Sequence, residues 1–254
     1  MDRAEALRAI DAGIALWWRT IGATPGFEVH RSDIEWVSSE GRAGPERIYA
    51  VRIQPCGAAR RLDEIEAAMR TGALPGSMLL TPLSTPEDIA EQLRRRGLSI
   101  SDADPCMALE LDAYMPGASG PHIAAREVRS ESALRDWAEI VNRALFGGEL
   151  FTLAQYAAML TLESTRFYLA YWDGAPASAC MTVRGGQVAT LECVATLPEY
   201  RRRGLARAAV SLALSGMQED GVKIAALRAE PDGIRLYEEL GFMEYCRRVV
   251  ASVD

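Results

Sequence analysis

The sequence lacks the features that mark zinc proteins, disulfide-stabilised proteins and membrane proteins. Among 254 residues there are only two histidines, His30 and His122, and the five cysteines are scattered with no Cys-x-x-Cys pair. Neither a structural zinc nor a disulfide framework is therefore expected, and no metal site is predicted. No run of about 18 apolar residues occurs, so no segment is predicted to span a bilayer. The N-terminus has no signal-peptide pattern, which predicts a cytoplasmic protein.

The sequence also lacks an excess of positive charge. The formal net charge is -7, which disfavours wholesale binding to nucleic acid or to an anionic membrane surface. One local exception is the run Arg201-Arg202-Arg203, which can still bind a phosphate group. With 49% hydrophobic and 25% charged residues, the composition is that of a globular protein. The length allows one large domain or two small ones, and we favour two.

The most linker-like segment is Pro116-Gly117-Ala118-Ser119-Gly120-Pro121, because glycine and proline extend neither a helix nor strand pairing. We therefore expect a first domain over residues 1–116, a linker over 117–122 and a second domain over 123–254. In the first domain the spacing of apolar residues predicts helices and strands in alternation. The helices are expected over 3–22, 61–69 and 86–96, and the strands near 27–37, 48–53, 77–80 and 107–111.

In the second half, three strands are predicted in close order, with Asp173-Gly174 and Gly185-Gly186 between them. Asp-Gly and Gly-Gly are strong hairpin signals, so these strands are expected to form an antiparallel meander. The whole order is that of an α+β fold, in which helices cover a mixed sheet. Strands are expected over 123–128, 166–172, 177–183, 188–196, 224–228 and 245–250, and helices over 131–145, 152–162, 202–220 and 233–240.

The two halves carry a weak internal similarity. Pro86 through Leu98 parallels Pro231 through Phe242, since each runs from a proline turn through a short helix and a glycine into a strand. One interpretation is a duplication in which only the second copy kept its chemistry. The other is two unrelated strand-helix-strand units.

The segment Leu191 to Ala206 predicts a strand that leads through a turn into the N-terminus of a helix. The first turn of a helix leaves backbone N–H groups without partners, and the helix dipole adds positive potential, so an anion is favoured there. The arginines strengthen this field, and Gly204 lets the backbone approach an oxygen closely. A diphosphate fits such a site, whereas the alternative is a solvated cluster of surface arginines.

The residues of this turn, together with a later segment, resemble the motifs of a known family. Arg201-x-x-Gly204-x-Ala206, after Val194-Ala195-Thr196-x-Pro198, resembles the acetyl-coenzyme A signature of the GNAT (Gcn5-related N-acetyltransferase) superfamily, and Leu236 to Phe242 resembles its second hallmark. The resemblance covers about residues 123–250, and the tail of the first half resembles a degenerate copy without the arginine-glycine turn. The implied fold is the three-layer α/β/α GNAT-like acyl-CoA N-acyltransferase fold with a mixed, mostly antiparallel sheet, possibly in tandem.

The resemblance implies an N-acetyltransferase with acetyl-coenzyme A as co-substrate and a primary amine of a small molecule or protein as acceptor. Backbone groups of Val194 and Thr196 would pair with the pantetheine arm like an added strand, since its amides mimic a peptide edge. Backbone N–H groups after Tyr200 would hold the pyrophosphate. The complete predicted binding set is Val194, Ala195, Thr196, Arg201, Arg202, Arg203, Gly204, Leu205, Ala206 and Arg207.

Two residues are predicted to be catalytic. Tyr237 matches the position from which the family supplies a proton to the departing thiolate, and the alternative is a core tyrosine. Glu192 is the candidate general base, with a solvent-facing or amine-orienting carboxylate as the alternative. Strand alternation places its side chain on the same face as Val194 and Thr196, and Cys193 on the opposite face. Cys193 is then a small buried hydrophobe, which favours direct transfer in a ternary complex.

Several points stay open at this stage. A non-catalytic acyl-coenzyme A sensor or partner-binding module is the alternative function, and the acyl group need not be acetyl. The net acidity hints at a cationic acceptor. The first half is expected to supply structure, one wall of the site or a homodimer surface. The two histidines, Trp17, Trp18 and Trp137 are expected to serve packing or surface roles.

Overall fold

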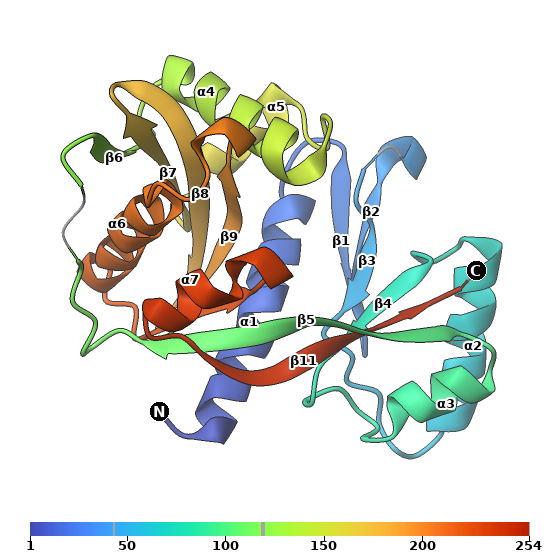
Figure 1. Cartoon of the computed structure of the whole chain (residues 1–254). Coiled ribbons are helices and arrows are strands. Elements are labelled where there is room, and N and C mark those ends of the chain that lie inside the picture. Colours follow the sequence, from blue (N-terminus) through green and yellow to red (C-terminus); the bar gives the residue numbers. More distant parts are fainter. Residues whose placement is uncertain (43, 118–119, 254) are drawn as a thin grey trace.

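The computed structural model describes residues 1–42, 44–117 and 120–253, and leaves out the side chains of residues 42, 102 and 103. Residues 118 and 119 of the predicted linker lie outside this description. The described strands form a single eleven-stranded mixed sheet in the order β1-β2-β3-β4-β11-β5-β10-β9-β8-β7-β6 (Figure 1). Both halves of the chain therefore contribute to one sheet.

The first half begins with a long helix that the sequence predicts correctly. Its N-terminus is capped by Asp2, whose carboxylate accepts a hydrogen bond from the Glu5 N–H at 2.7 Å, and such caps satisfy a backbone donor that the helix leaves unpaired. The strand near 107–111 is longer than predicted. The elements are α1 (Arg3–Gly22), β1 (Phe27–Arg31), β2 (Glu35–Ser39), β3 (Arg47–Tyr49), α2 (Ala58–Thr71), β4 (Ser77–Leu80), α3 (Ile89–Arg95) and β5 (Ser99–Glu110).

The second half contains the predicted meander, in which β7, β8 and β9 pair antiparallel in chain order. The predicted helix over 131–145 is divided into α4 (Glu131–Val141) and a short π-helix (Asn142–Phe146). The remaining elements are β6 (Ile123–Glu127), α5 (Leu153–Leu160), β7 (Thr165–Trp172), β8 (Ala175–Gly185), β9 (Val188–Thr196), α6 (Leu205–Glu219), β10 (Ile224–Arg228), α7 (Ile234–Glu239) and β11 (Met243–Ser252).

The last strand of each half is exchanged with the other half. β5 lies between β10 and β11, and β11 lies between β4 and β5, with antiparallel pairing throughout. Figure 1 shows these two long strands running side by side across the middle of the molecule. Each half thus completes its part of the sheet with a strand from the other half.

The exchange makes the internal repeat visible. The order β3-α2-β4-α3-β5 repeats as β9-α6-β10-α7-β11, and the first two strands of each series pair parallel. The residue that precedes each first helix is a glycine in the left-handed region, with φ 83° at Gly57 and 86° at Gly204. The first half therefore keeps the glycine of the turn, contrary to the prediction, and has Gln54-Pro55-Cys56 where the second half has the three arginines. This correspondence supports duplication over two unrelated units.

Helices cover both faces of the second half of the sheet. Helices α6 and α7 pack into one apolar cluster with Leu191 and Tyr237, whereas α1, α4 and α5 contribute to a second cluster on the opposite face. Trp137 is fully buried in that second cluster and donates its indole N–H to the Cys180 carbonyl at 2.9 Å, which confirms a packing role. No helix in the described ranges is long and apolar enough to cross a membrane.

Candidate active site

The central feature of the site is a gap between two parallel strands. β9 and β10 pair from Ile224 with Val188 up to Leu227 with Leu191, and their pairing ends there. Beyond Leu191, β9 continues to Thr196 and pairs only with β8, while Arg228 pairs with Cys106 of β5. The edge of β9 that faces β10 is thus open over residues 192–196. This segment includes Val194, Ala195 and Thr196 of the predicted binding set.

A β-bulge lies within this open segment. Cys193 has φ 53°, and the pairing with β8 shifts by one residue between Ala179 and Met181. Val194 packs with the α6–α7 cluster, whereas Cys193 and Glu192 lie on the face of α1. The prediction from strand alternation is therefore wrong: Glu192 faces away from Val194 and shares its face with Cys193, because the extra residue resets the alternation.

The turn before α6 has the conformation of an anion cradle. Arg202 and Gly204 both have positive φ, at 63° and 86°, and such turns direct successive N–H groups to one side. Within the described residues, the N–H groups of Arg202, Arg203 and Gly204 form no backbone hydrogen bond. Those of Leu205, Ala206 and Arg207 belong to the first helical turn, where intrahelical acceptors are missing. Six consecutive donors are therefore available.

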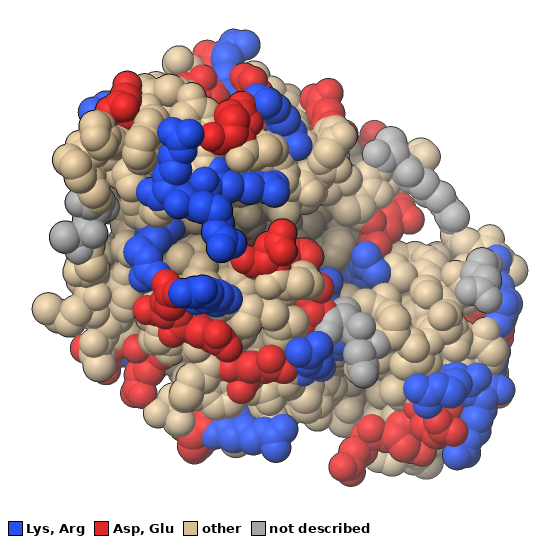
Figure 2. Space-filling model, in the orientation of Figure 1, with Lys and Arg blue, Asp and Glu red and all other residues tan. Residues whose placement is uncertain are grey.

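The arginine side chains have distinct environments around this cradle. Arg201 donates to the Thr196 carbonyl at 3.3 Å, and the Arg203 guanidinium lies 4.9 Å from the centre of the Trp172 ring. Arg207 pairs with Glu239 and so joins α6 to α7. Arg202 is exposed. Figure 2 shows a group of basic side chains on this face, with acidic side chains beside it, so the positive surface is local.

Tyr237 lies on the α6–α7 side of the gap. It is 6% exposed and contacts Phe242, with ring centroids 5.9 Å apart. Its ring packs so closely on Gly233 that a Cβ there would lie 3.0 Å from the tyrosine ring. Burial raises the pKa of Tyr237, so the phenol stays protonated at neutral pH and can donate.

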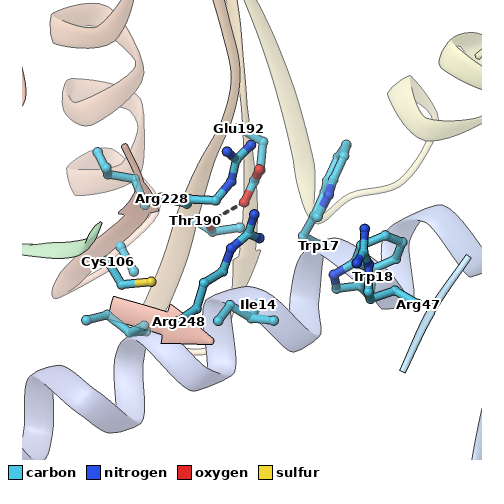
Figure 3. Close-up of a pocket in the computed structure, with 12 residues that line it drawn as sticks. Ile14, Trp17, Trp18, Arg47, Cys106, Thr190, Glu192, Arg228 and Arg248 are labelled. Carbon is cyan, nitrogen blue, oxygen red and sulfur yellow. Dashed lines mark hydrogen bonds between the residues drawn. The ribbon is translucent and has the colours of Figure 1, made fainter. Parts of the chain in front are cut away.

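The other side of the gap opens into a cavity of about 170 Å³. Figure 3 shows Glu192, Arg228 and Arg248 reaching into it from the sheet, and Trp17 and Trp18 standing on α1. Both halves of the chain line the cavity. The lining residues are Ile10, Ile14, Trp17, Trp18, Arg47, Cys106, Thr190, Glu192, Ala226, Leu227, Arg228 and Arg248.

Glu192 is the carboxylate of this cavity. It accepts a hydrogen bond from the Thr190 hydroxyl at 2.7 Å. Burial raises the pKa of Glu192, while this hydrogen bond and the positive charges of Arg228 and Arg248 act in the opposite direction. A carboxylate with a raised pKa is a better proton acceptor at neutral pH than a solvated one. Glu192 thus brings a buried carboxylate to the gap.

Comparison with known proteins agrees with this geometry. Residues 132–242 match the model of the Acetyltransferase (GNAT) family. This region is a GNAT acetyltransferase domain. The GNAT fold supports acyl transfer in general, and the family uses acyl-coenzyme A. The matched region contains β9, the cradle, α6 and Tyr237. A search of curated protein sequences gives no match.

Solved structures of similar fold extend the likeness over the whole chain. A GCN5-related N-acetyltransferase from Kribbella flavida is 20% identical over 95% of each chain, with a TM-score of 0.74. A tandem GNAT protein from the clavulanic acid biosynthesis pathway is 16% identical over 96% of this chain and 95% of that chain, with a TM-score of 0.64. The first half is thus part of a tandem GNAT fold.

The cavity also contains residues that the sequence did not single out. Arg47, Arg228 and Arg248 come from three different strands, and they meet only through the strand exchange. Trp17 and Trp18 line the cavity in addition to packing.

His30 stacks on Trp36, and His122 pairs with Asp173 at 2.8 Å, both outside the cavity. Within the described residues, no cluster of His, Cys, Asp or Glu could hold a metal ion.

Proposed function

We propose that this protein transfers an acetyl group from acetyl-coenzyme A to a primary amine by direct attack in a ternary complex. The observation that carries the proposal is the open edge of β9 over residues 192–196, which leads directly into six available N–H donors. Tyr237 and Glu192 lie on opposite faces of the sheet at the same gap. The diphosphate would bind at the cradle, and the pantetheine arm would pair with Val194 and Thr196.

Residues of this chain would carry out the proton transfers of the reaction. Bound acetyl-coenzyme A supplies an electrophilic thioester. The amine, on the α1 side, attacks the carbonyl carbon, so that a C–N bond forms and the C–S bond breaks. Glu192 accepts the proton that the nitrogen loses, directly or through water. Tyr237 donates a proton to the departing sulfur from the opposite side. Cys193 is buried, and burial raises its pKa, so it remains a thiol and no acyl-cysteine is needed.

The Gly204→Glu variant tests the cradle. A glutamate disfavours the left-handed conformation, at a cost of about 1–2 kcal/mol, and places a negative charge near the diphosphate, for about 1 kcal/mol at a solvated surface. We expect the Kd for acetyl-coenzyme A to rise about 30- to 150-fold, measured by isothermal titration calorimetry.

Gly221→Glu is the matched control for this experiment. Gly221 follows the opposite end of α6, has φ 76°, and has open space where a Cβ would lie. The control therefore introduces the same strain and the same charge away from the cradle, and should bind acetyl-coenzyme A like the unaltered protein. Equal affinity of both variants would contradict a cradle at Gly204.

Tyr237→Phe separates catalysis from coenzyme binding. Because the variant removes a proton donor and keeps the buried ring, we expect kcat to fall about 10- to 100-fold, with the Kd for acetyl-coenzyme A unchanged. Tyr114→Phe is the control, since Tyr114 lies in the same apolar cluster and its hydroxyl has no described partner. A sensor without catalytic function would bind the coenzyme and release no thiol, whether or not Tyr237 is changed.

A further inference from the structure

The cavity on the α1 side is unusual in its density of guanidinium groups. Arg47 of β3, Arg228 of β10 and Arg248 of β11 all line it, together with the single carboxylate of Glu192. The net charge of the whole protein is negative. The three guanidinium groups at the expected acceptor position therefore stand out against the acidity of the protein as a whole, and it is the local arrangement of charges that selects a ligand.

Two of these arginines share one carboxylate. A single Asp104 oxygen accepts from Arg228 at 3.0 Å and from Arg248 at 3.2 Å, and Arg228 also pairs with Glu230. Arg228 is thus neutralised on two sides, whereas Arg248 keeps donors for another anion. Its Nε is buried and has no hydrogen-bond partner among the described residues.

Arg47 is the third guanidinium and is rigidly placed. It lies 5.7 Å from the centre of the Trp18 ring, and Trp18 stacks on Tyr49 at 6.3 Å with an interplanar angle of 21°. Its Nε is buried and has no hydrogen-bond partner among the described residues, and the charges that act on it are the like charges of Arg248 and Arg228. A buried donor without an acceptor is costly, and a bound anion would satisfy it.

Positive and negative side chains lie at different places in the site, and neither sign of charge is in excess. Three arginines are balanced by Asp104, Glu230 and Glu192. A ligand that carries both signs fits this arrangement better than a simple cation or a phosphate dianion. The cavity volume of about 170 Å³ is also of the size that holds one small molecule, since a cavity of about 150 Å³ accommodates benzene.

We propose that the acceptor is a small amine that carries a carboxylate near the amino group, as in a free amino acid. The carboxylate would bind Arg47 and Arg248, the amine would face Glu192, and Trp17 and Trp18 would form the apolar wall. This inference rests on the proposed acetyl transfer and specifies its acceptor. It replaces the cationic acceptor that the net charge suggests.

The test compares acceptors that differ in one group. The twenty common L-amino acids and their primary amides are assayed with acetyl-coenzyme A, and the released thiol is measured. At least one amino acid should exceed its amide in kcat/KM by about 10- to 100-fold, the effect of one charged hydrogen-bonded contact. Arg47→Gln should raise the KM of that amino acid by a similar factor, and leave the values for the amide and for acetyl-coenzyme A unchanged.

Arg60→Gln is the matched control, because Arg60 is an arginine of the first half whose side chain is 87% exposed. Arg47→Lys should give an intermediate KM, since it keeps the charge and loses the planar fork. The proposal is overturned if amides react as well as amino acids, or if Arg47→Gln weakens both acceptors equally. Either result leaves acetyl transfer itself intact.

A binding measurement separates this inference from the proposed reaction. With coenzyme A bound and no turnover possible, amino acids and amides are titrated while tryptophan fluorescence reports on Trp17 and Trp18. Binding of an amino acid that Arg47→Gln weakens by a similar factor supports the carboxylate site, even if no thiol is ever released. Absence of amino acid binding overturns the inference, and calorimetry with acetyl-coenzyme A alone then decides the proposed function.

Discussion

Deleting residues 1–116 should leave no folded acetyltransferase domain. The deletion removes β5, which separates β10 from β11 in the sheet, and α1, which covers β9 and β10. β11 would lose both of its neighbours, β4 and β5. Because exposed strand edges and apolar sheet faces promote aggregation, we expect an insoluble or unfolded product. Circular dichroism and size-exclusion chromatography measure this directly.

The matched control cuts the chain and removes nothing. A protease site inserted between residues 117 and 120 allows the folded chain to be cleaved into these two segments. Since each segment contributes its last strand to the other, we expect the cleaved protein to elute as one complex and to retain activity. A soluble, monodisperse and active fragment of residues 117–254 would show that the strand exchange is dispensable.

Changing Glu192 to Gln should lower kcat by about 100- to 10,000-fold, the usual contribution of a general base. The amide has nearly the same shape and retains a partner for Thr190, so the Kd for acetyl-coenzyme A should stay unchanged. Glu163→Gln serves as the control, because Glu163 is an exposed carboxylate next to β7. An equally active Glu192→Gln variant would assign the carboxylate to orienting the amine or to no role at all.

The same variant has a predicted effect on stability. Burial raises the pKa of Glu192 in the folded protein, so the folded state holds this proton more tightly than the unfolded chain does. The contribution of this proton to the stability of the folded state is fully present below the pKa of Glu192 in the unfolded chain, near 4.3. It is lost as the pH rises through the pKa of Glu192 in the folded protein. Glu192→Gln should therefore have a higher Tm than the unaltered protein at pH 8 and an equal Tm below about pH 4. A lower Tm at pH 8 would contradict the raised pKa.

Local features of the sequence predicted the turns and the order of elements in the second half of the chain. The turn at Gly204, the hairpins at Gly174 and Gly186, and the order of elements around them depend on residues that are close in the chain. Backbone conformation at such turns is decided by the glycines themselves. The structure places these glycines at positive φ.

Non-local features could not be predicted in this way. The exchange of β5 and β11 depends on which strand edges meet in space, and no short pattern records it. The orientation of Glu192 was predicted wrongly because the bulge at Cys193 adds one residue to the strand, and the sequence there reads as a regular alternation. In the sequence, Arg47, Arg228 and Arg248 cannot be distinguished from ordinary strand residues, because only the fold brings them to one cavity.

A crystal structure with acetyl-coenzyme A tests the central claim most directly. We expect the diphosphate on the N–H groups of residues 202–207, the pantetheine arm along Val194 and Thr196, and the thioester at the gap between Tyr237 and Glu192. A coenzyme bound anywhere else, with the edge of β9 left open, would contradict it.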